Sequence, residues 1–193
     1  MAKEKKHGLR IVFNSPVVLT FSIICCIALI LDKITGGWAN VHLFSVYRSS
    51  LASPMTFLRF FTHVFGHASI SHLSNNLMMI LILGPMLEEK HGAKDLVFVI
   101  ASTAICTGLV NYIFFPNTML LGASGVVFAF ILLSSVTGAK QGQIPVTLIL
   151  VMIVYLGEEV YNGVFMKDNV SQLTHIIGGL VGALLGYIGQ DRD

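Results

Sequence analysis

Ser124 and His175 are two residues that can do chemistry, and both stand in stretches of sequence without charge. Ser124 lies in Gly122-Ala123-Ser124-Gly125, and His175 lies in an apolar stretch that extends to Gly189. Serine is a weak nucleophile until a neighbouring base takes its proton, and histidine is the usual base. Together they indicate acyl transfer. Either motif alone is weaker evidence for catalysis. Small residues in membrane helices usually serve packing, and a lone histidine is more often a structural hydrogen-bonding group.

His72 and Asn76 add hydrogen-bond donors. They are four residues apart, so they share one face of a helix. Donors aimed at a developing oxyanion stabilise acyl-transfer transition states, and the backbone N–H of Ser124 at a helix N-terminus is a third candidate. No Asp or Glu lies in the core of an expected span. We therefore expect a Ser–His dyad rather than a triad.

The composition indicates that a membrane surrounds these residues. Hydrophobic residues make up 54% of the 193 residues and charged residues 11%, against about 25% charged in soluble domains. The ranges 96–139, 141–157 and 169–190 contain no Asp, Glu, Lys or Arg, and a spanning helix needs about 20 apolar residues. A net charge of +2 without a basic stripe gives no reason to expect nucleic-acid binding.

We expect one all-α domain over residues 1–193, a bundle of six membrane-spanning helices. A short cytoplasmic tail, residues 1–12, precedes the first span, and a long aromatic outer loop, residues 32–71, is expected to be partly immersed in the bilayer. The expected spans are Ser15–Leu31, His72–Leu87, Asp95–Phe115, Ser124–Ala139, Ile144–Val160 and Ser171–Gly189.

The distribution of Lys and Arg predicts the orientation. With the N-terminus inside, eight of these residues fall on the cytoplasmic side and four outside, as the positive-inside rule requires. Both termini are then cytoplasmic, and the even-numbered spans run inward. His72, Asn76, Ser124 and His175 all come near the outer end of their spans. Glycines at 178, 182 and 186 would let the last span pack closely against the fourth.

These motifs resemble those of the rhomboid family of intramembrane serine proteases. They are His63-x3-His67-x4-His72-x3-Asn76, Gly122-Ala123-Ser124-Gly125 and His175-x2-Gly178. The resemblance implies that Ser124 is the nucleophile, that His175 is the base, and that His72, Asn76 and the Ser124 amide form the oxyanion hole.

The resemblance also implies supporting residues. Gly122 would allow a tight turn, Phe128 would stack on His175, and His63 and His67 would be structural. Arg59 matches the family's first-loop arginine, and Glu88 matches the glutamate that ends the second span. Leu58 replaces the usual tryptophan before that arginine, Phe128 replaces a common tyrosine, and Asn75 replaces a common aromatic residue near the substrate gate.

The implied substrates are single-span membrane proteins cut near the outer end of their span. We expect a multi-pass protein of the bacterial plasma membrane, partnered by substrates and lipid, with no cofactor and no metal. Three other readings compete. His63 and His67 have the spacing of a zinc pair but no accompanying Glu, a catalytically dead relative would only bind membrane proteins, and a transporter is disfavoured because no inverted repeat is found.

Overall fold

The computed structural model describes residues 11–136, 146–147, 149–150, 153–154 and 169–189. Within them the structure is helical, apart from one isolated β-bridge. Three helices are long and apolar enough to cross a membrane: α1 (Pro16–Ile34), α4 (Ile70–His91) and α5 (Ala93–Phe114). Two more apolar helices, α6 (Ser124–Val136) and α8 (Asn169–Gly189), complete the described bundle. The all-α membrane fold expected from the sequence is confirmed.

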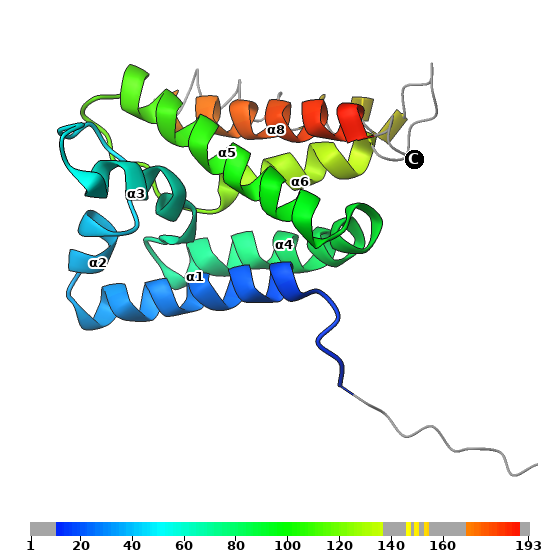
Figure 1. Ribbon diagram of the computed structural model, residues 1–193, viewed down its shortest axis with the longest axis horizontal. Coiled ribbons are helices and arrows are strands. Elements are labelled where there is room, and N and C mark those ends of the chain that lie inside the picture. The colour runs from blue at the N-terminus through cyan, green and yellow to red at the C-terminus, as the bar shows by residue number, and fades with distance from the viewer. Residues whose placement is uncertain (1–10, 137–145, 148, 151–152, 155–168, 190–193) are drawn as a thin grey trace, which may run out of the picture.

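The helices alternate in direction across the bundle. Figure 1 shows α1 and α5 running one way and α4, α6 and α8 the other. The main pairings are α6 with α8, α5 with α8 and α1 with α4. The N-terminal ends of α4, α6 and α8 therefore lie at one end of the molecule, which we call the site end.

Four expected spans match observed helices to within a few residues, namely the first, second, third and sixth. The fourth begins at Ser124 as expected, and α6 is described as far as Val136. Most of the expected fifth span, residues 144–160, lies outside the described residues.

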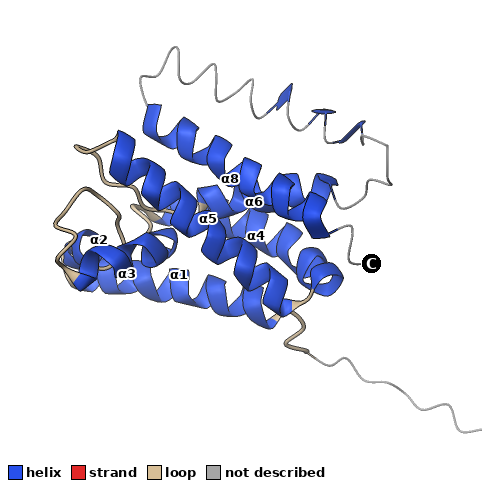
Figure 2. Cartoon of the chain, turned by 45° about the horizontal axis from the view of Figure 1, so that its top comes forward, coloured by secondary structure: helices blue, strands red, loops and turns tan. Residues whose placement is uncertain are grey.

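The connection between α1 and α4, residues 35–69, is helical rather than extended. It contains α2 (Trp38–His42), α3 (Pro54–Thr62) and the 3-10 turn η1 (His63–Phe65), and it lies at the site end (Figure 2). Pro54 stands at the start of α3, where its missing N–H costs nothing.

Arg59 holds this connection together. Its guanidinium donates to the Tyr47 hydroxyl and to the Ser49 hydroxyl, each at 2.7 Å, and lies 4.2 Å from the centre of the Tyr47 ring. The side chain is buried, so these bonds offset the cost of removing its charge from water. The neighbouring Leu58 is exposed, and the anchoring of the connection therefore does not depend on it.

Glu88 caps the N-terminus of α1. Its two carboxylate oxygens accept hydrogen bonds from the backbone N–H groups of Val17 and Val18, each at 3.0 Å. Ser15, the N-cap residue, makes no side-chain cap bond. The carboxylate thus satisfies two N–H groups that have no partner within the helix and places a negative charge at the positive end of the helix dipole.

Candidate active site

Ser124 opens helix α6 two residues after a glycine of positive φ. Gly122 has φ +126°, and a Cβ atom there would lie 2.8 Å from Nε2 of His72. Its N–H donates to the carbonyl of His63 at 2.9 Å. The backbone angle and the space both favour glycine over any other residue type at this position.

The loop before Ser124 is tied to the α1–α4 connection. Val46 and Leu120 form an antiparallel bridge with two backbone hydrogen bonds of 2.9 Å. The buried amide of Asn111 donates to the Val46 carbonyl at 3.0 Å. As the first residue of α6, Ser124 presents a backbone N–H that has no acceptor within the helix.

His175 lies on α8, which packs parallel to α6. A Cβ atom on Gly178 would lie 2.3 Å from the Gly125 carbonyl oxygen, and one on Gly182 would lie 2.1 Å from that of Ala129. The two helices thus touch backbone to backbone with a register that repeats every turn. This confirms the close packing expected from the glycine ridge, and Gly125 contributes the facing small residue.

Phe128 places the imidazole of His175. The two rings are stacked, with centroids 4.4 Å apart and planes 7° apart. Phe128 is one helical turn after Ser124, and side chains in a helix lean toward its N-terminus. Stacking on Phe128 therefore brings His175 to the turn of α6 that carries Ser124. The phenyl ring makes this stack without the hydroxyl of a tyrosine.

His72 and Asn76 approach the same loop from α4. The Cβ position of Gly122 lies near His72 Nε2, as above, and 3.9 Å from the Asn76 amide nitrogen. His72 and His175 are near enough for a charge on one ring to affect the other. Helices α4, α6 and α8 thus bring to one place the four residues that the sequence singled out.

His67 fixes the amide group of Asn76. Its Nδ1 lies 3.0 Å from the carbonyl of Phe65, which can only accept, so Nδ1 carries the proton. Its Nε2 must then accept from the Asn76 amide nitrogen at 3.1 Å. The amide nitrogen has a second proton, which His67 does not accept. Burial lowers the pKa of His67 to about 4, so the ring stays neutral and able to accept near neutral pH.

His63 serves the framework of the site. It is buried, its Nδ1 lies 3.2 Å from the carbonyl of Arg59, and its Nε2 lies 3.3 Å from the hydroxyl of Thr107. Burial lowers its pKa to about 4. The ring nitrogens of His63 and His67 are thus directed at different protein groups, and this arrangement does not suit a shared metal ion.

The sequence reading missed several residues that support the loop. They are Tyr47, Thr107, Asn111 and the pair Val46–Leu120. A buried Asn in an apolar helix was a signal that could have found Asn111, because such a side chain needs partners. The β-bridge had no local signal.

A comparison with known protein families shows the family to which this chain belongs. Residues 54–192 match the model of the Rhomboid domain, which covers more than half of the chain. The chain belongs to the rhomboid family. As a member it is an integral membrane protein of a family whose general activity is intramembrane proteolysis.

Three curated relatives are similar along most of this rhomboid chain. Rhomboid-related protein 2 of Mus musculus is 29% identical over 158 residues, which are 71% of this chain and 52% of the relative. Rhomboid-like protein 11, chloroplastic, of Arabidopsis thaliana is 27% identical over 144 residues, 67% of this chain and 51% of the relative. Rhomboid-related protein 1 of Caenorhabditis elegans is 28% identical over 141 residues, which are 67% of this chain and 39% of the relative. The chain spans about half the length of these relatives or less.

Proposed function

We propose that this rhomboid is a serine endopeptidase that cleaves other membrane proteins by a Ser124–His175 dyad. The observation that carries the proposal is the stacking of Phe128 on His175 across the parallel contact of α6 and α8. It brings the only histidine of α8 to the turn that begins with Ser124. If the glycines of α8 served packing alone, they would explain the contact between α6 and α8. They would not explain why a histidine is held beside the turn that carries Ser124.

In the first half of the reaction, Ser124 Oγ attacks the scissile carbonyl carbon while His175 takes the hydroxyl proton. The electron pair of the carbonyl moves to its oxygen. The Ser124 N–H, the second amide proton of Asn76 and a ring N–H of His72 stabilise this oxyanion. When the carbonyl re-forms, the C–N bond breaks, and the leaving nitrogen takes the proton from His175. An acyl-serine ester and the first product remain.

In the second half, water attacks the ester carbon and gives its proton to His175. The same donors stabilise the second oxyanion. Collapse breaks the ester bond, returns the proton from His175 to Ser124 Oγ and releases a carboxylic acid product. No cofactor is required, because Ser124 and His175 end the cycle with the protons and electron pairs with which they began it.

The depth of the site favours single-span membrane proteins as substrates. The four residues lie at the site end of α4, α6 and α8, not at mid-bundle, so they meet a substrate near the end of its span. The excess of Lys and Arg on the other side supports an outer position for the site end and a cytoplasmic position for both termini. The expectation of a bacterial plasma membrane rests on the sequence alone, since the three relatives come from a mouse, a plant and a nematode.

A cleavage assay in lipid vesicles tests the proposal. The protein is reconstituted with a panel of single-span substrates, and fragments are detected by mass. Ser124→Ala and His175→Ala should each abolish cleavage, whereas Ser134→Ala, on the same helix and away from the site, should not. Cleavage that persists in purified Ser124→Ala protein contradicts the mechanism. If the wild-type protein binds the panel and cuts none of it, the binding-only reading holds instead.

A further inference from the structure

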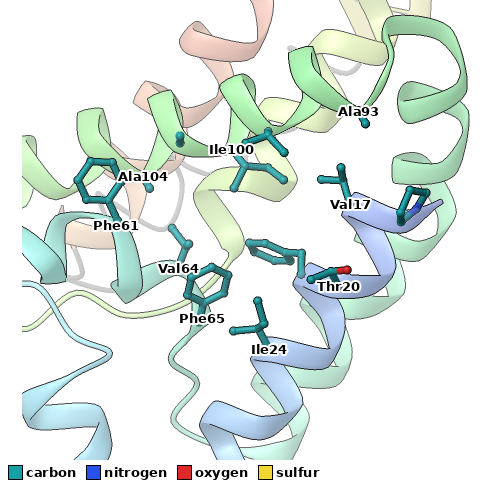
Figure 3. A pocket seen from close by; sticks show the side chains of 13 residues that line it. Val17, Thr20, Ile24, Phe61, Val64, Phe65, Ala93, Ile100 and Ala104 are labelled. Atoms are coloured by element: carbon teal, nitrogen blue, oxygen red, sulfur yellow. The ribbon is translucent and has the colours of Figure 1, made fainter.

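An apolar groove of about 500 Å³ lies between α1 and α5, away from the candidate active site (Figure 3). Its α5 wall includes Ala93, Val97 and Ala104, and its α1 wall includes Pro16 and Ile24. Val97 is 51% exposed and Ile24 is 37% exposed. Because both helices cross a membrane, hydrocarbon rather than water surrounds these side chains, and whatever fills the groove comes from the bilayer.

The groove has the length of one leaflet. It extends along α1 from Pro16 to Ile24 and along α5 from Ala93 to Ala104. At a rise of about 1.5 Å per residue these stretches measure about 12 Å and about 17 Å. Half of a bilayer's hydrocarbon core is about 15 Å. The groove therefore begins where α1 and α5 both leave the membrane surface and ends near mid-membrane.

Aromatic side chains close the deep end of the groove. Phe61, Val64 and Phe65 of α3 and η1 lie across it (Figure 3). The ring of Phe65 contacts that of Phe21 on α1, with centroids 5.1 Å apart. A membrane-spanning helix of a substrate or of a second copy would collide with this barrier. An acyl chain, which reaches only to mid-membrane, ends where the barrier begins.

A positive charge stands at the open end. Lys94 is exposed and lies three, seven and ten residues before Val97, Ala101 and Ala104, so it shares their face of α5. The acidic Asp95 is one position further round the helix. A lipid whose chain follows this face has its phosphate beside Lys94.

We propose that the groove is a binding site for an anionic phospholipid of the leaflet that α1 enters first. One acyl chain fills the space between α1 and α5, and Lys94 binds the headgroup phosphate. On the proposed orientation this is the cytoplasmic leaflet. The bound acyl chain packs against α1, the α1–α4 connection and α5, and so stabilises their arrangement. The inference does not depend on proteolysis.

Photo-crosslinking tests it directly. The protein is reconstituted in phosphatidylcholine vesicles that contain a trace of phosphatidylglycerol with a diazirine in mid-chain, illuminated, digested and mapped by mass spectrometry. Adducts should concentrate on the peptides with Ile24 and with residues 97–104, and excess unlabelled phosphatidylglycerol should remove them. The Ser124→Ala protein should give the same map, which separates this site from the proposed activity.

Two variants sharpen the result. Ala101→Phe fills the groove and should lower these adducts about tenfold, the loss expected when the chain forfeits burial of about two methylene groups. Leu109→Phe, at an exposed position of α5 outside the groove, should not. Lys94→Gln should abolish the preference over a matching phosphatidylcholine probe, while Lys33→Gln at the other end of α1 should keep it.

The map of the wild-type protein decides the proposal even if Ala101→Phe fails to fold. Adducts spread evenly over all lipid-facing helices, or adducts that unlabelled phosphatidylglycerol does not displace, overturn the binding site. A wild-type map without adducts on the groove peptides overturns the choice of occupant. Equal labelling by the two headgroups overturns the role of Lys94.

Discussion

At the scale of single residues, the orientation of one amide matters most. Asn76 has two amide protons, and His67 accepts one of them at 3.1 Å. His67 can do so because its own proton is engaged by the Phe65 carbonyl. We expect His67 to act as a positioning residue, which acts on the reaction only through Asn76.

This arrangement predicts different losses for the two residues. Asn76→Ala removes a donor to the oxyanion and should lower kcat by up to about 100–1000-fold, as in soluble hydrolases, with little change in KM. His67→Phe leaves the donor but frees its orientation, so its loss of kcat should be smaller, about tenfold. Steady-state cleavage kinetics in vesicles measure both.

The control is His42→Phe, which removes an exposed imidazole whose contacts are the Trp38 ring and the Trp38 carbonyl rather than a residue of the site. It should leave kcat unchanged. A wild-type kcat in the Asn76→Ala protein would show that Asn76 is not part of the oxyanion hole. If His67→Phe lowers thermal stability and leaves kcat unchanged, His67 has only a structural role.

At the scale of elements, the contact between α6 and α8 sets the geometry of the dyad. Gly182 and Gly179 are neighbours on α8 but differ in their surroundings. A Cβ atom on Gly182 would lie 2.1 Å from the Ala129 carbonyl oxygen, whereas one on Gly179 would lie 3.4 Å from the nearest atom of Leu132. The first distance requires the helices to move apart, and the second is tolerable contact.

Gly182→Ala should therefore destabilise the protein by about 1–3 kcal/mol, the range typical of overpacked cores, and lower kcat because α8 carries His175. Gly179→Ala should be neutral or slightly stabilising, since alanine favours a helix over glycine. Thermal unfolding in detergent and cleavage kinetics measure the pair. Equal behaviour of the two variants would mean that the register does not control the site.

The elements also show what a sequence can predict. Long charge-free stretches located α1, α5 and α8, because a bilayer imposes a simple rule of length and polarity. The helices of the α1–α4 connection escaped prediction, because their stability comes from long-range partners such as Tyr47 with Arg59. The cap that Glu88 provides for α1 joins residues 70 positions apart, and no local pattern reveals it.

The candidate site was foreseeable for a different reason. Ser124, His175, His72 and Asn76 are polar groups that a membrane helix tolerates only at a cost, so each stood out against its neighbours. The role of His67 in orienting Asn76 could not be foreseen, because it depends on which ring nitrogen faces which partner.

At the scale of the whole molecule, the side of the membrane that the site end faces decides where a substrate is cut and which leaflet supplies the lipid. Single cysteines in place of Trp38 and Asn117, both exposed at the site end, should react with an impermeant thiol reagent added to intact cells. A cysteine in place of Lys94, at the opposite end, should react only after the membrane is opened. The background needs alanine at Cys25, Cys26 and Cys106. The reverse pattern would place the site in the cytoplasm.

The central claim is that His175 activates Ser124, and a small fluorophosphonate probe measures this most directly. Such a probe reacts with a serine whose hydroxyl a base has activated, and it does not react with a serine that only packs or donates to backbone. The folded wild-type protein in lipid should take up one probe per chain at Ser124, located by peptide mass. His175→Ala should abolish the adduct, and a metal chelator should leave it intact. Folded protein without an adduct at Ser124, even with the smallest fluorophosphonates, would contradict the claim, as would full labelling of the His175→Ala protein.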